Sequence, residues 1–250
     1  LVVSQVGVFF GVDALPCYRP LKAYKKPGGG IAFDSKSGYC DRPIELSCGQ
    51  CRGCRVARSR EWALRISHEA QLHEENCFLT LTYDDRHVPS DGSLDVTEWQ
   101  RFAKRLRKRC GPFRFYHCGE YGDANFRPHY HACVFGLDFS GDRELFRRGN
   151  APLFTSATLG ELWPSGFSTI GALTFETAAY VARYIVKKVT GDQAEAHYGG
   201  RKPEYATMSR RPGIGAEWLE RFRSDVYPSD QVVLGGRVFR PPRFYDDRLE

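Results

Sequence analysis

The sequence predicts an α+β fold, a central antiparallel sheet with helices packed on one face and the other face left open. One observation is a set of strand-like segments, rich in β-branched and aromatic residues, at 77–83, 113–120 and 127–136. A second is the helical spacing of apolar residues, which recurs at 55–75, 95–109 and 176–189. A third is the order of the elements (helix, strand, helix, strand, strand, helix), which is typical of this class.

Composition restricts the classes of protein that the chain can represent. The 250 residues are 42% hydrophobic and 14% aromatic, which indicates a globular protein rather than a disordered one. The net charge is +6, and no apolar run approaches the roughly 20 residues that span a bilayer. Residues 1–10 lack the basic start of a secretory signal, and nine cysteines suit a reducing cytosol better than a disulfide framework.

The N-terminal region combines an irregular arm with a cysteine cluster. Prolines and glycines predict irregular structure over 1–47, which is followed by Cys48, Cys51 and Cys54. The Cys-x2-Cys-x2-Cys spacing lets three thiolates bind one ion, with Cys17 or Cys40 as the fourth ligand. Structural zinc is favoured over an iron–sulfur cluster, because no fourth cysteine follows closely; three free cysteines around a turn are the alternative.

The next elements carry much of the positive charge. The helix at 55–75 has a buried stripe that includes Ile66, and Arg55 and Arg58 crowd its first half. Asp95 and Glu98 predict a capping box that starts the helix ending near 109. The exposed basic residues of that second helix include the following: Arg101, Lys104, Arg105. Either cluster could contact a DNA backbone or could be an ordinary solvated helix face.

The C-terminal half contains shorter elements. We expect a loop over 137–153, a helical turn at 159–163 and a strand at 167–173. After the helix at 176–189, a further helix is expected at 216–225, and a hairpin at 232–239 that turns at the Gly235–Gly236 pair. The expected domains are an arm (1–54), a core (55–200) and a C-terminal extension packed on the core (201–250).

The strand 127–136 contains the candidate metal ligands. His129 and His131 leave the same face, because side chains alternate along a strand. The polar run 121–127 reads as a hairpin loop, so that the antiparallel return would bring Glu120 beside the histidines. Two imidazoles and a carboxylate suit Mg²⁺ or Mn²⁺ acting on a phosphate.

The helix at 176–189 carries two candidate nucleophiles. Tyr180 and Tyr184 are four residues apart and share a helix face, with Lys187 and Lys188 beside them. The plain interpretation is that each tyrosine packs its ring and turns its hydroxyl to water. A neighbouring ammonium group and a divalent cation would both favour the phenolate, which could attack a phosphodiester in line.

Three ordered motifs resemble those of the HUH superfamily of single-strand endonucleases, named for two histidines that flank a hydrophobic residue. They are Cys-Phe-Leu-Thr-Leu-Thr-Tyr at 77–83, His-Tyr-His at 129–131 and Tyr-Val-Ala-Arg-Tyr-Ile-Val-Lys at 180–187. The two-tyrosine motif is similar to that of the microvirus replication initiators. Cys-Gly-Gln-Cys-Arg-Gly-Cys-Arg, Gly-Glu-Tyr-Gly and Met-Ser-Arg-Arg-Pro-Gly-Ile-Gly resemble the gokushovirus-type members, and the likeness spans 17–245.

The resemblance implies a ferredoxin-like or RRM-like palm and a rolling-circle replication initiator that nicks single-stranded viral origin DNA and rejoins the circle. His129, His131 and Glu120 would bind the metal, with His117 as the runner-up, although strand parity puts it on the opposite face. Tyr184 and Tyr180 would be alternating nucleophiles, supported by Lys187 or Lys188.

The resemblance also implies partners and a location. Arg127 and Arg183 would join the basic clusters in binding DNA, and Tyr83, Phe115 or Tyr116 would stack bases or fill the core. The sequence has no Gly-x-x-x-x-Gly-Lys loop, so we expect a host helicase and the host replication machinery to act with the protein in the bacterial cytoplasm.

Two rival functions use parts of the same pattern. A cupin-type iron oxygenase also uses His-x-His, but its carboxylate follows the histidines, whereas positions 134–136 here are Val, Phe and Gly. A non-catalytic, zinc-stabilised single-stranded DNA-binding protein would have an inert HUH remnant. The joint presence of both histidines, Glu120 and both tyrosines argues against it.

Overall fold

The computed structural model describes residues 17–122, 125–189 and 193–249, and of residues 184–187 it describes the backbone but not the side chains. The chain divides into two compact units. The smaller contains the described residues up to Arg58 together with Val233–Arg240, and the larger contains Ser59–Val232 and the described residues from Pro241 onward.

The smaller unit contains an antiparallel sheet of three strands, ordered β2-β1-β3. These are β1 (Leu21–Lys25), β2 (Ile31–Ala32) and β3 (Pro43–Leu46). The prediction of irregular structure over 1–47 is therefore wrong for this part. The glycines 28–30 have positive φ angles and form the turn between β1 and β2, so they separate strands rather than abolish them.

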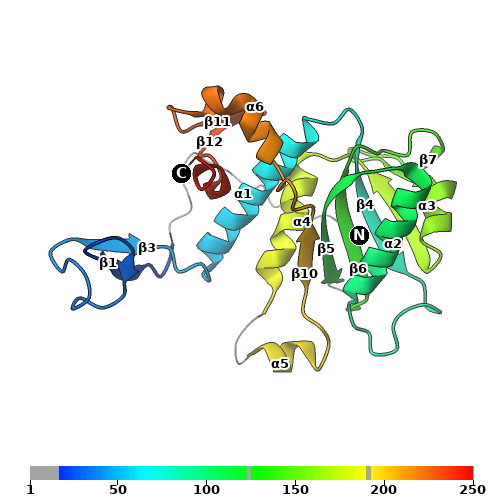
Figure 1. The fold of residues 1–250 in the computed structure, drawn as a ribbon. Helices are drawn as coiled ribbons and strands as arrows, with labels where there is room; N and C mark the ends of the chain where they lie inside the picture. Colours follow the sequence, from blue (N-terminus) through cyan, green and yellow to red (C-terminus); the bar gives the residue numbers. More distant parts are fainter. Residues whose placement is uncertain (1–16, 123–124, 190–192, 250) are drawn as a thin grey trace. The chain divides into compact units, whose positions relative to one another are not determined.

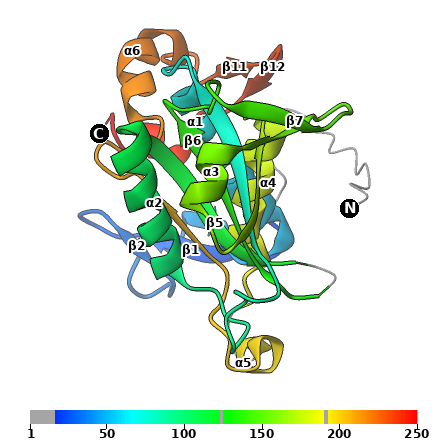
Figure 2. The ribbon, with the colours of Figure 1, turned by 90° about the vertical axis from the view of Figure 1, so that its right-hand side faces the viewer.

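A sheet of seven antiparallel strands organises the larger unit, in the order β10-β5-β6-β4-β9-β8-β7 (Figures 1 and 2). The strands are β4 (Asn76–Tyr83), β5 (Arg114–Tyr121), β6 (Pro128–Phe135), β7 (Arg143–Arg147), β8 (Leu153–Ser156), β9 (Gly166–Gly171) and β10 (Tyr205–Met208). The α+β class, the central antiparallel sheet and the three strands that predicted it are confirmed.

Seven helices and one short hairpin complete the described structure. The helices are α1 (Arg52–Ala70), α2 (Val96–Cys110), α3 (Ala157–Leu162), α4 (Phe175–Lys187), α5 (Gln193–Tyr198), α6 (Ala216–Val226) and α7 (Arg243–Asp246). The predicted hairpin is confirmed as β11 (Val232–Leu234) and β12 (Arg237–Phe239), with Gly235 and Gly236 in the turn at positive φ.

Helices cover both faces of the large sheet, and not one face as predicted (Figure 1). On one face, α2 and α3 pack over a cluster that includes Leu79, Leu81 and Tyr130. On the other, α1 and α4 pack over a cluster that includes Phe78 and Phe135. The physical reason is that β4 and β6 carry large apolar side chains on both faces, and each set must be removed from water. The histidine face is therefore open only in part.

Several elements of the larger unit escaped prediction because they are short and lie at or near the sheet edges. The expected loop at 137–153 contains β7 and the start of β8, and all five residues of β7 are exposed, so the strand has no apolar alternation. At the other edge, β10 has four half-buried residues and pairs with β5. Short edge strands give weak sequence signals because only one side of the backbone is paired.

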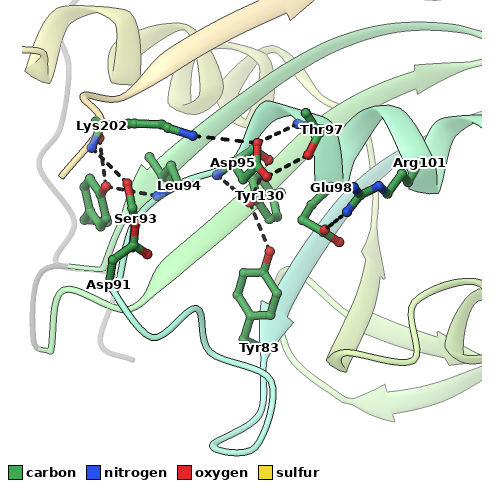
Figure 3. Close-up of polar contacts among 11 residues, drawn as sticks. Tyr83, Asp91, Ser93, Leu94, Asp95, Thr97, Glu98, Arg101, Tyr130 and Lys202 are labelled. Atoms are coloured by element: carbon green, nitrogen blue, oxygen red, sulfur yellow. Dashed lines mark hydrogen bonds and ion pairs between the residues drawn. The ribbon is translucent and has the colours of Figure 1, made fainter.

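The start of α2 confirms part of the predicted cap (Figure 3). The Asp95 side chain accepts hydrogen bonds from the Thr97 backbone N–H at 3.0 Å and from its hydroxyl at 2.6 Å. Glu98 does not return to the Asp95 N–H, because it accepts a hydrogen bond from Arg101 instead. The Tyr130 hydroxyl accepts from that N–H at 3.1 Å. The capping-box prediction is thus correct for Asp95 and wrong for Glu98.

A buried histidine lies where α1, α6 and α7 meet. The ring of His68 is inaccessible to solvent and stacks on Trp218, with ring centroids 3.6 Å apart. Its Nδ1 shares a hydrogen bond of 2.7 Å with the Tyr245 hydroxyl. Burial lowers the pKa of His68 to about 3, because the charged imidazolium would lose its hydration. His68 is therefore neutral in the folded protein throughout the physiological range.

This burial predicts a loss of stability in acid. An unfolded histidine takes up a proton below pH ~6.5, while folded His68 does not until near pH 3, so its contribution is complete above ~6.5 and declines as the pH falls. Between pH 7 and pH 5, the free energy of unfolding should fall by about 2 kcal/mol more in the wild type than in His68→Phe. Urea unfolding at both pH values measures this difference, and equal slopes in the two proteins would contradict it.

Candidate functional site

The β5–β6 hairpin places Glu120 beside the two histidines, as the sequence predicted. Glu120 pairs with His129 in the strand register, and His131 pairs with Cys118 on β5 and with Thr80 on β4. The Glu120 Oε1 and His131 Nε2 atoms lie 2.9 Å apart. Both side chains are buried, at 5% and 6% exposure, so their hydrogen bond is shielded from water.

His129 presents one ring nitrogen as a potential ligand. Its Nδ1 donates a hydrogen bond of 2.6 Å to the Arg127 carbonyl oxygen, so the neutral ring carries its lone pair on Nε2. Burial lowers the pKa of His129, and the nearby His131 lowers it further. Both effects favour the neutral imidazole, which is the form that binds a cation.

Thr80 supports the other histidine from the neighbouring strand. Its Oγ1 lies 3.0 Å from His131 Nδ1. A hydroxyl both donates and accepts, so Thr80 can stabilise either tautomer of His131. Sequence reasoning placed Thr80 in a strand but gave it no role, because its contact with His131 depends on the register between β4 and β6. The signal was its place within the Thr-Leu-Thr alternation of residues 80–82.

The donor set fits a divalent cation by its chemistry, although its members are not gathered as tightly as the cysteines are. The His129 and His131 rings are nearly parallel, with centroids 6.5 Å apart. In the described part of the chain, only one group brings three or more ligand atoms within 4.8 Å of one another, and it is the cysteine cluster. A buried carboxylate and two imidazoles nevertheless match the ligands that Mg²⁺ and Mn²⁺ take.

Helix α4 brings one of the two tyrosines to this site. The Tyr180 ring packs edge-on against His131, with ring centroids 5.4 Å apart and the planes at 83°. Its other neighbours are Phe78, at 6.4 Å between centroids, and the guanidinium of Arg183, at 5.8 Å from the ring. The Tyr184 and Lys187 side chains lie outside the described residues.

His117 lies away from this site. As strand parity predicted for the runner-up ligand, it belongs to the opposite face, where its ring stacks on Trp99 with centroids 3.9 Å apart. The Nδ1 atom shares a hydrogen bond of 3.1 Å with Thr207. Burial, together with the charge of His131, holds the pKa of His117 well below its usual value. Its surroundings are those of a core residue.

The basic residues of α2 are also separated from the histidines. Helix α2 packs on the sheet face opposite His131. Arg101 and Lys104 are exposed there, while Arg105 donates a hydrogen bond of 3.1 Å to the Leu162 carbonyl. A DNA strand that follows the histidine face would therefore not meet this cluster, contrary to the picture that the sequence suggested.

The remaining basic candidates differ in their surroundings. Arg127 donates to the backbone carbonyl at the end of β4 and forms an ion pair with Asp85. Arg183 is exposed on α4, and Lys188 is the half-buried C-cap residue of the same helix. Arg55 and Arg58 belong to the first half of α1, in the smaller unit.

The smaller unit contains a compact group of four cysteines whose sulfur atoms lie within 4.8 Å of one another, namely Cys17, Cys48, Cys51 and Cys54. The tertiary structure thereby selects Cys17 over Cys40, which is exposed and outside the group. Backbone N–H groups of Cys54 and Tyr18 point at the Cys51 sulfur and lower its pKa to about 6, which favours the thiolate. This cluster could bind a structural metal ion.

None of the helices in the described ranges combines the length and the apolar character needed to cross a membrane. The remaining expectations about partners concern DNA, for which comparison with other proteins is informative.

A family model for the replication-associated protein ORF2 matches residues 76–189, which run from the start of β4 to just beyond α4. The chain is 33% identical to the replication-associated protein VP4 of Bdellovibrio phage phiMH2K, over 92% of this chain and 76% of the relative. It is 30% identical to the replication-associated protein ORF2 of Spiroplasma virus 4, over 94% and 81%. The replication-associated protein ORF4 of Chlamydia phage 1 is 32% identical, over 82% and 53%.

No solved structure matches the chain significantly. The relatives align with both units, and the matched family region contains the paired histidines, Glu120 and both tyrosines. The chain belongs to the replication-associated protein family of the gokushovirus-type microviruses and acts in the initiation of viral DNA replication.

Proposed function

We propose that the protein is an HUH endonuclease that nicks single-stranded viral origin DNA through a covalent phosphotyrosine and later rejoins the strand. The observation that carries the proposal is the contact between Tyr180 on α4 and His131 on β6, which in turn is hydrogen-bonded to Glu120. A phenol next to a potential cation site is the arrangement that a transesterification of DNA requires.

The reaction exchanges one phosphoester bond for another. The tyrosine oxygen forms a bond to phosphorus and loses its proton, while the bond to the 3′ oxygen breaks and that oxygen gains a proton. The products are a 5′-phosphotyrosine and a free 3′ hydroxyl. Because the ester is conserved, attack by a 3′ hydroxyl reverses the step and reseals DNA without ATP. A second tyrosine, Tyr184, would allow two transfers in turn.

His129, His131 and Glu120 would hold Mg²⁺ or Mn²⁺, which when bound would polarise the scissile phosphate. The chain prepares these ligands by hydrogen bonding. The Arg127 carbonyl keeps the proton of His129 on Nδ1, and Thr80 contacts the Nδ1 of His131. Such partners orient imidazole ligands and usually change metal affinity by about 10- to 100-fold when removed.

Covalent capture of DNA tests the proposal directly. The protein is incubated with Mn²⁺ and a labelled single-stranded DNA library of random sequence, and adducts are resolved on a denaturing gel. We expect an adduct with the wild type, less with Tyr180→Phe or Tyr184→Phe, and none with the double variant. Lys187→Ala and Lys188→Ala would show which ammonium group assists the attack.

Mass spectrometry of the DNA-linked peptide identifies the nucleophile. An adduct that persists in the double variant would disprove the assignment of both tyrosines. A mobility shift on a native gel with no adduct in any protein would instead support the non-catalytic DNA-binding function. A host helicase would separate the strands ahead of the nick, and adding a purified bacterial helicase to the reaction on duplex circles would test this partner.

We also propose that the four cysteines bind one structural Zn²⁺. Thiolates in a four-cysteine set are typical zinc ligands, and the backbone N–H groups directed at the Cys51 sulfur would stabilise its negative charge. Elemental analysis should find about one zinc per chain in the wild type and little in Cys51→Ser. Cys40→Ser is the matched control, because Cys40 lies in the same unit but outside the cluster. Equal zinc content in both variants would contradict the assignment.

A further inference from the structure

A cavity of about 300 Å³ lies at the tip of the β5–β6 hairpin, next to the candidate metal ligands. Its main lining residues are Tyr121, Phe126, His197, Tyr198, Arg201 and Glu204. Gly122 also lines it and lies against His129, since a Cβ atom at Gly122 would be 3.0 Å from the His129 ring. The cavity therefore adjoins the site at which we propose that DNA is cut.

One wall of the cavity is a platform of rings and a cation. The Arg201 guanidinium lies 4.9 Å from the Tyr121 ring centroid and 5.1 Å from that of Phe126. Phe126 is 52% exposed and has a φ of +51°, which is unfavourable for a residue with a Cβ atom. Strained backbone that presents an apolar ring to solvent is typical of binding sites, and stacked aromatic and arginine side chains are typical supports for unpaired bases.

The opposite requirement, a group that reads the base edge, is met by Glu204. Its side chain lines the cavity at 6% exposure and accepts a hydrogen bond from the Tyr198 hydroxyl. An ionised carboxylate has about four acceptor positions, so Glu204 retains capacity for a donor inside the cavity. The exocyclic amino groups of cytosine, adenine and guanine are such donors, whereas thymine has none.

We propose that this cavity binds one nucleobase that carries an exocyclic amino group, within the single-stranded DNA that approaches His129. The base stacks on Phe126 and Arg201, and its amino group donates to Glu204. This site rests on the proposed function for its substrate, single-stranded DNA, and adds a base preference beside the scissile link. The cavity volume is at the lower end for small-ligand pockets, which suits one base rather than a stack.

The other cavity of similar size, about 320 Å³, has the wrong electrostatics for this role (Figure 3). Three carboxylates line it, those of Asp91, Asp95 and Glu98, and they would repel phosphodiesters. Tyr83 and Tyr116, which the sequence offered as stacking residues, are buried in the core at 4% and 0% exposure. Exposed Phe126 replaces them as the candidate.

Equilibrium binding tests the proposal without any chemistry. The Tyr180→Phe/Tyr184→Phe double variant is titrated into a fluorescent dT tract and into the same tract with one central dC, and anisotropy is recorded. We expect tighter binding of the dC-containing tract. Adding Phe126→Ala should weaken binding of both tracts by about tenfold or more. Adding Glu204→Gln should remove the preference for dC and leave binding of the dT tract unchanged.

Matched controls separate this site from general effects. Phe146→Ala removes a phenylalanine of similar exposure, 55%, on β7, and should leave both affinities unchanged. Circular dichroism confirms that each variant folds. Equal affinity of Phe126→Ala and its parent, or a dC preference that survives Glu204→Gln, would overturn the proposal.

A final comparison distinguishes a base within DNA from a free nucleotide. Free dCMP should displace the oligonucleotide only at concentrations far above the oligonucleotide's Kd, because the strand adds backbone contacts. Displacement by dCMP at equal concentration would overturn the assignment to single-stranded DNA. Because the double variant cannot form an adduct, a wild type that forms none disproves the nicking chemistry alone, and these titrations decide the base pocket alone.

Discussion

Alanine in place of His131 is expected to reduce the rate of covalent adduct formation by about a hundred- to a thousand-fold. The imidazole lies between Glu120, at 2.9 Å, and the edge-on ring of Tyr180, so its removal takes a ligand from the proposed cation site at the point nearest the nucleophile. Loss of several kcal/mol of charge stabilisation in the transition state gives a rate reduction of this size. The measurement is the initial rate of adduct formation on labelled single-stranded DNA with Mn²⁺.

His87→Ala is the matched control for this prediction. His87 is an exposed histidine that pairs with Asp84 in the loop after β4, and it should be replaceable without loss of rate. Thermal unfolding must show that His131→Ala remains folded, because the substitution leaves Glu120 buried without its partner. A folded His131→Ala protein that forms adducts at the wild-type rate would exclude His131 from the site.

Glutamine in place of Glu69 should lower the free energy of unfolding by about 3 to 5 kcal/mol, the usual effect of removing one partner of a buried ion pair. Glu69 is 1% exposed and receives hydrogen bonds from Arg114 on β5 and from the Gly215 backbone N–H at 2.7 Å. It therefore links α1 to the sheet and to the start of α6. The neutral amide leaves the Arg114 guanidinium, which is 19% exposed, without a compensating charge.

Urea unfolding at neutral pH measures this effect. Glu220→Gln is the control, because Glu220 is 65% exposed and its contact with Arg248 is a surface ion pair, worth at most about 1 kcal/mol. If the two variants lose the same small amount of stability, the ion pair between α1 and β5 contributes little, and the attachment of α1 depends on apolar packing.

Local sequence patterns were sufficient for much of the candidate site. The period-2 alternation put His129 and His131 on one face, and the hairpin predicted between β5 and β6 was enough to bring Glu120 beside them. The helical period of α4 placed Tyr180 at the border of its buried stripe, where it contacts His131. These predictions succeeded because each depends on neighbours along the chain or on one tight turn.

Predictions that required distant neighbours failed more often. The Glu98 half of the capping box is wrong because the hydroxyl of Tyr130, 35 residues away in sequence, occupies the Asp95 N–H. The basic residues of α2 are remote from the histidine face because the apolar side of that helix packs on the opposite one. Edge strands β7 and β10 have too little buried surface to produce a recognisable pattern.

The sequence by itself determined the fold class, the identity of the donor residues and the family likeness, because these depend on residue types at short spacings. Only the tertiary structure selected Cys17 over Cys40, placed Thr80 behind His131, covered the second sheet face with α1 and α4, and formed the cavity beside Phe126. Each of these joins segments far apart in the chain. Their proximity is set by the burial of apolar surface over the whole domain, which no local pattern records.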